Sequence, residues 1–526
     1  MDNSTLHPIF EHLLTRRAAV LGGAAAIATL QSRAFAQATP EPANPDAVRG
    51  GTLRLGVQGD PVELDPGLVL LDAAGLVIEF VYESLVHEGP DLKPEPRLAT
   101  HWEISEDGLT YTFHLRDGVT FHNGRSLIAA DVKYTIDRIM NPDTASPWIG
   151  DTASIASVDA PDDATVVLNL NRPDASILSA LTRRGFGVVP QEEVEVNGDL
   201  RQMMVGTGPF RFVEFIPNSH LTLTRNENYW LEGRPYLDGL EVMVIPDDTA
   251  RITALVSGTL DMIEATPARS YETVDADEAL TRIGGDSTNL RWIVFNQRRE
   301  PWDRVEVRQA IARGIVRQQI IDAAVLGHGQ PLVGVYPARF WAGWPDPAPE
   351  GDIEAAKADL AALELPSDLK PGILSWAEYD FLLNTSIVVQ EQLKQMGIES
   401  EIEAEENATY LERHFGGDYD IAVMGAGGYR DPNDFIFQSF STDGSTNAAG
   451  YSNPKMDELL LAAIAESDIE KRRELYLEIQ ALQIEELPWL MLYTSANYTS
   501  MNAKVQGFEH YLSGSFDSIR EIWISE

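Results

Sequence analysis

The sequence predicts an α/β protein with open sheets and at least two domains. Strand-like alternation of apolar residues and helix-like apolar spacing are mixed along the whole chain, and no internal repeat is visible. The chain has 526 residues, which is too long for one simple core. Hydrophobic residues make up 44% of it, which is enough to fill several cores.

The strands expected in the first half of the chain follow from two-residue periodicity. Apolar and polar residues alternate over 53–57, 109–115 and 166–170, which is the pattern of a half-buried strand. Asp107-Gly108 supplies a turn before the second of these strands. Apolar residues at helical spacing then predict an amphipathic helix over 132–140. This part of the chain is therefore expected to contain a hairpin leading into a helix.

The second half is expected to contain a longer helix and a strand directly after it. The helix covers 385–396, and Gly397 stands at the position where a left-handed residue closes a helix. The strand-like run 398–402 follows, so the two elements form half of a βαβ unit. Apolar periodicity also predicts amphipathic helices at 456–464 and 475–482.

Residues 1–36 are predicted to be an export signal. Paired arginines at positions 16 and 17 precede an apolar run, 18–30, and a small-x-small cleavage motif ends at Ala36. The run is shorter than the roughly 20 apolar residues that span a bilayer. The paired arginines favour the twin-arginine route, and an ordinary secretory signal is the alternative.

The mature protein is expected to be monomeric and free in a Gram-negative periplasm. Residues 37–47 contain several prolines among small and polar residues, which predicts a disordered leader. There are no cysteines, so the chain has neither disulfides nor a cysteine for lipid attachment. We therefore expect no direct membrane anchor.

The charge of the chain excludes one class of partner. Acidic residues outnumber lysine and arginine by 81 to 40, and the formal net charge is −41. A surface this acidic repels phosphate backbones and anionic lipid headgroups, so no nucleic-acid partner is expected. Adaptation to salty surroundings is one interpretation, and a plain soluble acidic protein is the simpler one.

A long segment carries a family resemblance. It runs from Trp102 to Arg138 and reads WEISEDGLTYTFHLRDGVTFHNGRSLIAADVKYTIDR. This segment resembles the signature region of the family 5 extracellular solute-binding proteins, the peptide, opine and nickel class that serves ATP-binding cassette (ABC) importers. Further matches follow in family order at 50–67, 81–89, 206–230, 295–321, 393–403 and 474–493.

The resemblance implies a two-lobed periplasmic binding protein of the type II-like class, with open mixed sheets and an additional domain inserted in lobe I. By analogy, lobe I is expected at 48–81, 204–297 and 496–526. The inserted domain is expected at 82–203, and lobe II at 298–495.

No catalytic residue, cofactor or metal site is predicted. The chain lacks the serine-elbow, phosphate-loop and zinc-helix motifs. His114 and His122 flank a turn, but no third ligand is evident near His114, which favours a solvated pair. Only His328 and His414 fall in the predicted lobe II, so metal transport ranks below transport of an organic solute.

The resemblance places part of the ligand site around Gly428. In peptide-binding relatives an aspartate, three positions before the aspartate of an Asp-Pro pair, binds the α-ammonium group of the peptide. The aligned residue here is Gly428. Arg430 brings a positive charge that suits a carboxylate, phosphate or sulfonate, although pairing with a surface acid is the alternative. Tyr429 and Asp431 complete this group, and Asp431 also favours a turn because proline follows it.

Two further segments line the site in relatives. Trp292 offers an indole for stacking on a planar or sugar ligand, whereas its alternation with Val294 also fits a core residue. The ligand-binding candidates from these segments are Gln58, Gly59, Asp60, Thr288, Asn289 and Trp292.

The function implied by the resemblance is capture of an organic solute and its delivery to an inner-membrane ABC permease. A peptide, an opine-like compound and an oligosaccharide are the candidate solutes. The alternatives are a secreted hydrolase and a periplasmic chaperone or sensor subunit.

Overall fold

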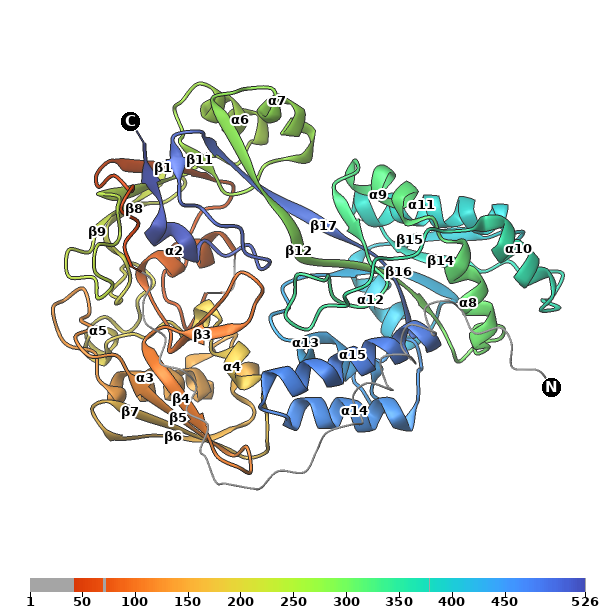
Figure 1. Cartoon of the computed structure of the whole chain (residues 1–526), viewed down its shortest axis with the longest axis horizontal. Helices are drawn as coiled ribbons and strands as arrows, with labels where there is room; N and C mark the ends of the chain where they lie inside the picture. The colour runs from red at the N-terminus through yellow and green to blue at the C-terminus, as the bar shows by residue number, and fades with distance from the viewer. Residues whose placement is uncertain (1–41, 70–71, 378, 526) are drawn as a thin grey trace. The chain divides into compact units, whose positions relative to one another are not determined.

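The computed structural model describes residues 42–69, 72–377 and 379–525. The predicted export signal, residues 1–36, lies outside the described residues, as does the first part of the predicted leader. Helices are mixed with parallel and antiparallel strands (Figure 1). The predicted α/β class with open mixed sheets is therefore confirmed.

The largest sheet of the described chain has 11 strands. Its order is β15-β14-β16-β12-β17-β11-β1-β10-β9-β8, and β13 also pairs with β17. The strands are β1 (Thr52–Val57), β8 (Phe210–Ile216), β9 (His220–Arg225), β10 (Gly239–Val244), β11 (Met262–Ile263), β12 (Leu280–Phe295), β13 (Gly329–Pro331), β14 (Gly372–Trp376), β15 (Glu401–Glu405), β16 (Ile421–Ala426) and β17 (Trp489–Asn502).

β12 and β17 join the two ends of this sheet (Figure 1). They pair along most of their length, but the register is irregular between Asp286 and Leu290 of β12. There the Ser287 hydroxyl donates to the Ser495 carbonyl at 2.7 Å, and the Thr494 hydroxyl donates to the Ser287 carbonyl at 2.8 Å. Side-chain hydrogen bonds therefore hold the strands together at the irregularity. The exact lobe boundaries stay a prediction.

The part of β12 beyond the irregularity is buried on both faces. Ile293 and Phe295 join an apolar cluster with residues of α8, α9 and α11. Trp292 and Val294 join a second cluster with residues of α14 and α15. The helices after β12 are α8 (Val305–Gly314), α9 (Arg317–Val325), α10 (Ile353–Ala361), α11 (Asp380–Gln395), α12 (Asn407–Gly416), α13 (Asn433–Phe440), α14 (Pro454–Ala465) and α15 (Ile469–Glu486).

The predicted strand–helix pattern of the second half is confirmed. α11 ends at Gln395, and Gly397 has φ +96° as a helix-closing glycine should. β15 pairs parallel to β14, so β14, α11 and β15 form a βαβ unit. β15 begins at Glu401 rather than at 398, because the Ile398 amide still bonds to the Leu393 carbonyl and belongs to the end of the helix.

A separate sheet of 4 strands contains the predicted hairpin. Its order is β4-β5-β7-β6, with β4 (Ala99–Ile104), β5 (Thr110–Leu115), β6 (Ile155–Asp162) and β7 (Thr165–Leu170). One face of β5 is buried in alternation, and helix α3 (Ala129–Met140) packs Val132, Ile136 and Ile139 into the same core. The strands predicted at 109–115 and 166–170 and the helix predicted at 132–140 are confirmed.

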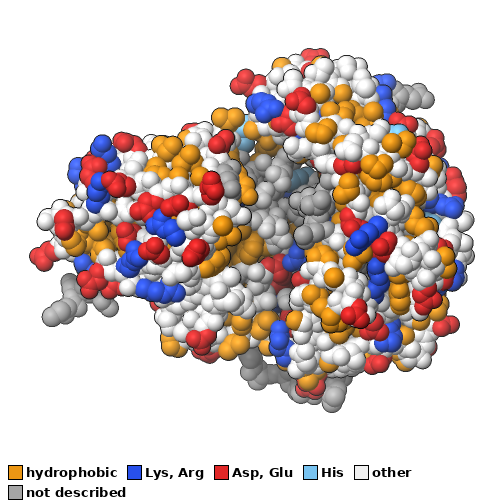
Figure 2. Space-filling view, turned by 180° about the vertical axis from the view of Figure 1, so that it is seen from behind, with side chains coloured by type: hydrophobic (Ala, Val, Ile, Leu, Met, Phe, Trp, Pro, Cys, Tyr) orange, Lys and Arg blue, Asp and Glu red, His pale blue; other side chains and the backbone are white. Residues whose placement is uncertain are grey.

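The remaining elements are short and complete the described chain. None of the described helices is long and apolar enough to cross a membrane. Figure 2 shows acidic side chains spread over the face that it draws, with basic side chains between them. The remaining helices and strands are α2 (Asp72–Val81), α4 (Ile177–Ala180), α5 (Gln191–Asn197), α6 (Asp248–Val256), α7 (Tyr271–Asp275), β2 (Val86–Glu88), β3 (Pro94–Pro96), β18 (Val505–Gln506) and β19 (Trp523–Ile524), and the 3-10 helices are Pro142–Thr144, Ile149–Thr152, Arg184–Phe186, Ala268–Ser270 and Asp517–Glu521.

Candidate functional site

A small charged pocket lies where the loop after β16 meets α2, β2 and the C-terminal segment. Its volume is about 50 Å³. Acidic and basic side chains line it together, so it offers complementary groups to a ligand that carries both charges. The charged side chains that line it include Glu79, Glu88, Arg183, Arg184 and Arg430.

Arg430 forms a buried ion pair across this pocket. Its Nε lies 2.8 Å from Oε2 of Glu88, and the two side chains are only 14% and 6% exposed. Burial favours the neutral guanidine, but the carboxylates of Glu88 and Glu79 outweigh it and raise the pKa of Arg430 above its ordinary value. The partner of Arg430 is therefore a buried acid from a distant part of the chain, and not a surface acid.

Glu79 is a half-buried acid beside this pair. Its carboxylate accepts hydrogen bonds from the Ser515 hydroxyl at 2.8 Å and from the Phe516 amide at 3.0 Å. Burial raises the pKa of Glu79 to about 7, against the opposing influence of Arg184 and with a further increase from Glu88. The charge of the pocket therefore changes near neutral pH.

Replacing Glu79 with glutamine is expected to change how stability depends on pH. The folded-state pKa of Glu79, about 7, is above the ordinary value of 4.5, so the folded state binds more protons between these values. The contribution of Glu79 to the free energy of unfolding therefore falls as pH rises through this range. Between pH 4.5 and pH 7.5, the free energy of unfolding of Glu79→Gln should rise by up to about 3 kcal/mol relative to that of the wild type. Urea denaturation at a series of pH values measures this difference.

The control for this experiment is Glu478→Gln, which removes one exposed acidic side chain from α15. It separates the effect of the half-buried Glu79 carboxyl from a change in net charge. If the wild type and Glu79→Gln show the same pH dependence, Glu79 does not titrate in this window.

Asp431 anchors the loop that carries Arg430. Both of its carboxylate oxygens lie 2.6 Å from guanidinium nitrogens of Arg472 on α15, and the Ser179 hydroxyl donates to it at 3.1 Å. It also accepts from the Asn433 amide at 2.9 Å, at the start of α13. Asp431 is fully buried, so its role is to hold the loop in place.

The structure brings Thr288, Asn289 and Gly428 together beside the strand irregularity. The Gly428 amide donates to the Thr288 hydroxyl at 3.1 Å. A Cβ on Gly427 would stand 2.2 Å from Oδ1 of Asn289, so a larger residue there would displace the Asn289 side chain. Gly428 has φ +80°, and a Cβ there would meet nothing within 4 Å. Space for a ligand group is therefore available beside Gly428.

Trp292 and Tyr429 are core residues. Trp292 is 3% exposed, and its ring stacks on Trp489 with centroids 4.4 Å apart. Tyr429 is fully buried against the rings of Tyr336 and Phe340. These placements favour the packing alternative for Trp292 over contact with a ligand.

The predicted loop Gln58–Asp60 makes contacts of its own. The backbone amide of Gln58 donates to the Glu264 carboxylate at 2.6 Å, and the Asp60 carboxylate accepts from the backbone amide of Asn218 at 2.7 Å. Glu264 directly follows β11, and Asn218 lies in the turn between β8 and β9. The contacts of this loop therefore involve a different part of the fold from those of the Gly428 group.

Sequence reasoning missed the acidic half of the site. Glu79 and Glu88 line the pocket, but nothing near them in the sequence distinguishes them from the other 79 acidic residues of the chain. Ser515 and Phe516, which bond to Glu79, come from the opposite end of the chain. Only their spatial pairing with Arg430 and the C-terminal segment identifies them.

Comparisons with known proteins agree on one family. The family model described as "Bacterial extracellular solute-binding proteins, family 5 Middle" matches residues 93–448. The chain is 28% identical to heme-binding protein A of Haemophilus influenzae over 79% of this chain and 81% of that protein. It is 27% identical to the oligopeptide-binding protein OppA of Bacillus subtilis over 84% of this chain and 87% of that protein.

A solved structure agrees with the fold. The structure of HbpA2 from Haemophilus parasuis matches with a TM-score of 0.85 at 25% identity, over 90% of this chain and 100% of that chain. The predicted two-lobed periplasmic binding protein fold is thereby confirmed.

Proposed function

The chain belongs to the bacterial extracellular solute-binding proteins of family 5, and from that membership we propose that it captures a zwitterionic organic solute where Arg430 meets Glu88. It is the solute-binding component of an ABC importer. A short peptide or an opine-like compound is the proposed solute, because each carries amine and carboxylate groups derived from amino acids.

The observation that carries this proposal is the buried Arg430–Glu88 pair. The pocket of about 50 Å³ is far smaller than the roughly 300–1,000 Å³ of most ligand pockets, so a solute has to separate the two side chains. Buried charges lose much free energy when they stay unpaired. A zwitterion replaces both partners at once, with a carboxylate for Arg430 and an ammonium for Glu88.

Glu88 also accounts for the glycine at position 428. In the resembled peptide-binding proteins an aspartate at that position binds the ammonium group, and here the position carries no charge. We propose that Glu88, the acid paired with Arg430, supplies the negative charge instead. Charged groups dominate the pocket lining, which favours an amino-acid derivative over an oligosaccharide.

The remaining parts of the proposal concern location and partners. We propose export by the twin-arginine route, on the paired arginines at positions 16 and 17, and action in the periplasm as a monomer. The solute then passes unchanged to an inner-membrane permease. The rival, a secreted hydrolase, predicts turnover of the bound compound.

Titrations with a dipeptide and its blocked forms test the charge requirement. Isothermal titration calorimetry with the mature protein is expected to show binding of the free dipeptide and weaker binding of its N-acetyl and C-terminal amide forms. Equal affinity for all three forms would exclude a zwitterion site.

Replacing Gly428 with aspartate should move the preference toward the ammonium group. Aspartate is among the residues that tolerate positive φ, and the space beside Gly428 is open. Gly428→Asp is expected to increase the affinity ratio of a free-amine peptide to its N-acetyl form by about tenfold, or about 1.4 kcal/mol.

Gly397→Asp is the matched control for this variant. Gly397 has φ +96° and open space around its Cβ position, but it closes α11. An equal change of ligand preference in both variants would mean that the charge acts from the whole surface and not from the site.

A further inference from the structure

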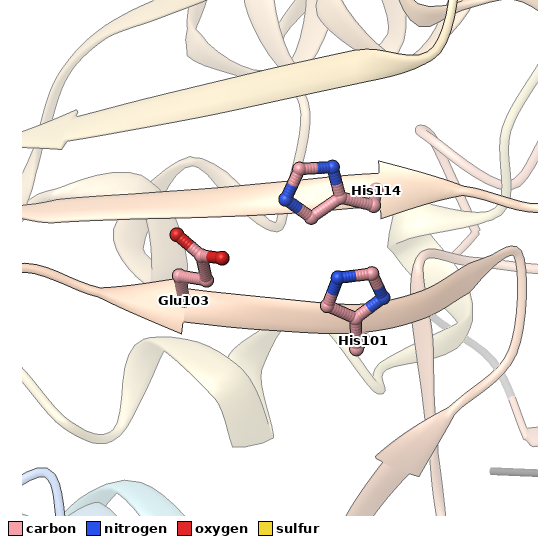
Figure 3. Close-up of side chains that lie close together, drawn as sticks. All are labelled: His101, Glu103 and His114. Atoms are coloured by element: carbon pink, nitrogen blue, oxygen red, sulfur yellow. The ribbon is translucent and has the colours of Figure 1, made fainter. Parts of the chain in front are cut away.

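Two histidines and a glutamate lie together on the sheet of β4 and β5 (Figure 3). His101 and Glu103 come from β4, and His114 comes from β5. One ligand atom of each residue lies within 4.8 Å of the others. Both histidines are half-buried and Glu103 is exposed, so solvent reaches the group. None of these residues lines the pocket beside Arg430.

The strand register brings the side chains together. His101 pairs with His114 across the two antiparallel strands, and Glu103 follows two residues later on the same face. A β-bulge separates the Ala99–Leu115 pair from the His101–His114 pair and leaves Thr100 as the extra residue. The centroids of the two imidazole rings lie 4.4 Å apart, with an angle of 14° between the ring planes.

Thr100 engages one ring nitrogen of His101. Its hydroxyl lies 2.9 Å from Nδ1 of His101 and 3.2 Å from the His114 carbonyl, to which it can donate its hydrogen. This contact occupies Nδ1 and leaves Nε2 of His101 as the nitrogen that can face a metal. A hydrogen bond that fixes one ring nitrogen in this way is the usual arrangement of a metal-binding histidine.

We propose that His101, Glu103 and His114 form a binding site for a divalent transition-metal cation such as Zn²⁺. In Figure 3 one nitrogen of each imidazole and the carboxylate of Glu103 face a common space. Two imidazoles and a carboxylate are a donor set that Zn²⁺ takes with further coordination positions open. Zn²⁺ bonds of about 2.0–2.2 Å hold ligand atoms at most about 4.4 Å apart, so small side-chain rotations complete the site.

The structure corrects the sequence interpretation of His114. That interpretation paired His114 with His122 and found no third ligand near it. The ring nitrogens of His122 instead face the Gly208 carbonyl at 3.0 Å and the Gly206 amide at 3.4 Å, and His122 is buried. The neighbours of His114 are His101 and Glu103.

Zn²⁺ titration of the mature protein tests the site. The buffer should contain millimolar Mg²⁺ and Ca²⁺, because these hard cations occupy the many surface carboxylates and compete poorly for imidazole. We expect one Zn²⁺ per chain by calorimetry, and a loss of affinity of about tenfold or more in His101→Ala and in His114→Ala.

His220→Ala is the matched control. His220 lies 3.5 Å from Glu214 and is similarly exposed, but the described residues hold no three-residue group of metal-ligand type around it. It should bind Zn²⁺ as the wild type does. Unchanged Zn²⁺ affinity in both His101→Ala and His114→Ala, or the same loss in His220→Ala, would overturn the proposal. Melting temperatures without metal verify that each variant is folded.

Discussion

Replacing Asp431 with alanine is expected to lower the free energy of unfolding by about 3–5 kcal/mol. The change leaves the guanidinium of Arg472 without its carboxylate partner. Because Arg472 is only 4% exposed, water cannot replace that partner well. It also removes the acceptor for the Asn433 amide at the start of α13. Urea denaturation at neutral pH measures the loss.

A double-mutant cycle separates the ion pair from the other contacts of Asp431. Asp431→Ala combined with Arg472→Met removes both charges, so no charge stays buried without a partner. The double variant should be more stable than the sum of the single losses predicts. Additive losses, or a loss below about 1 kcal/mol for Asp431→Ala, would contradict the role of Asp431 as a buried anchor.

Arg430→Ala and Glu88→Gln are each expected to weaken solute binding by about tenfold or more, which is about 1.4 kcal/mol. The two variants should affect recognition of different ends of the solute. Arg430→Ala should lose affinity for a peptide with a free carboxylate and little for its amide. Glu88→Gln should lose affinity for a free ammonium group and little for the N-acetyl form. The physical reason is that each variant removes the partner of one solute charge.

Calorimetry with the three ligand forms distinguishes this pattern from a structural role. Arg201→Ala is the control, because Arg201 is half exposed and pairs with Glu63 at the surface. A uniform loss for all ligand forms would mean that the Arg430–Glu88 pair only holds the protein together. No loss in either variant would place the solute elsewhere.

The local elements were predictable because their signals are local. Alternation over 109–115 and 166–170 predicts two strands, because alternate residues of each lie in the same apolar core as α3. That these two strands, β5 and β7, pair with each other is known only from the structure. Gly397 marks the end of α11 because its backbone needs positive φ. The two-lobed architecture could be predicted only from the resemblance to the family, because neither the periodicity nor the composition of the sequence indicates it.

The site was predictable only in part, because its contacts are long-range. The segment around Gly428 and Arg430 could be found from its resemblance to relatives. The partner of Arg430 could not, since a long stretch of the sequence separates Glu88 from Arg430 and only the fold brings them into contact. The group around His101 depends on a β-bulge at Thr100, and strand register is not visible in the residues themselves.

The most direct test is mass spectrometry of the protein purified from the cells that produce it natively. Intact protein under native conditions gives the stoichiometry, and small molecules released by denaturation give the identity of the solute. We expect one organic molecule per chain, which carries both an amine and a carboxylate and stays unchanged on incubation. A bound sugar or uncharged compound would contradict the proposed site, and conversion of the compound to products would contradict the binding function.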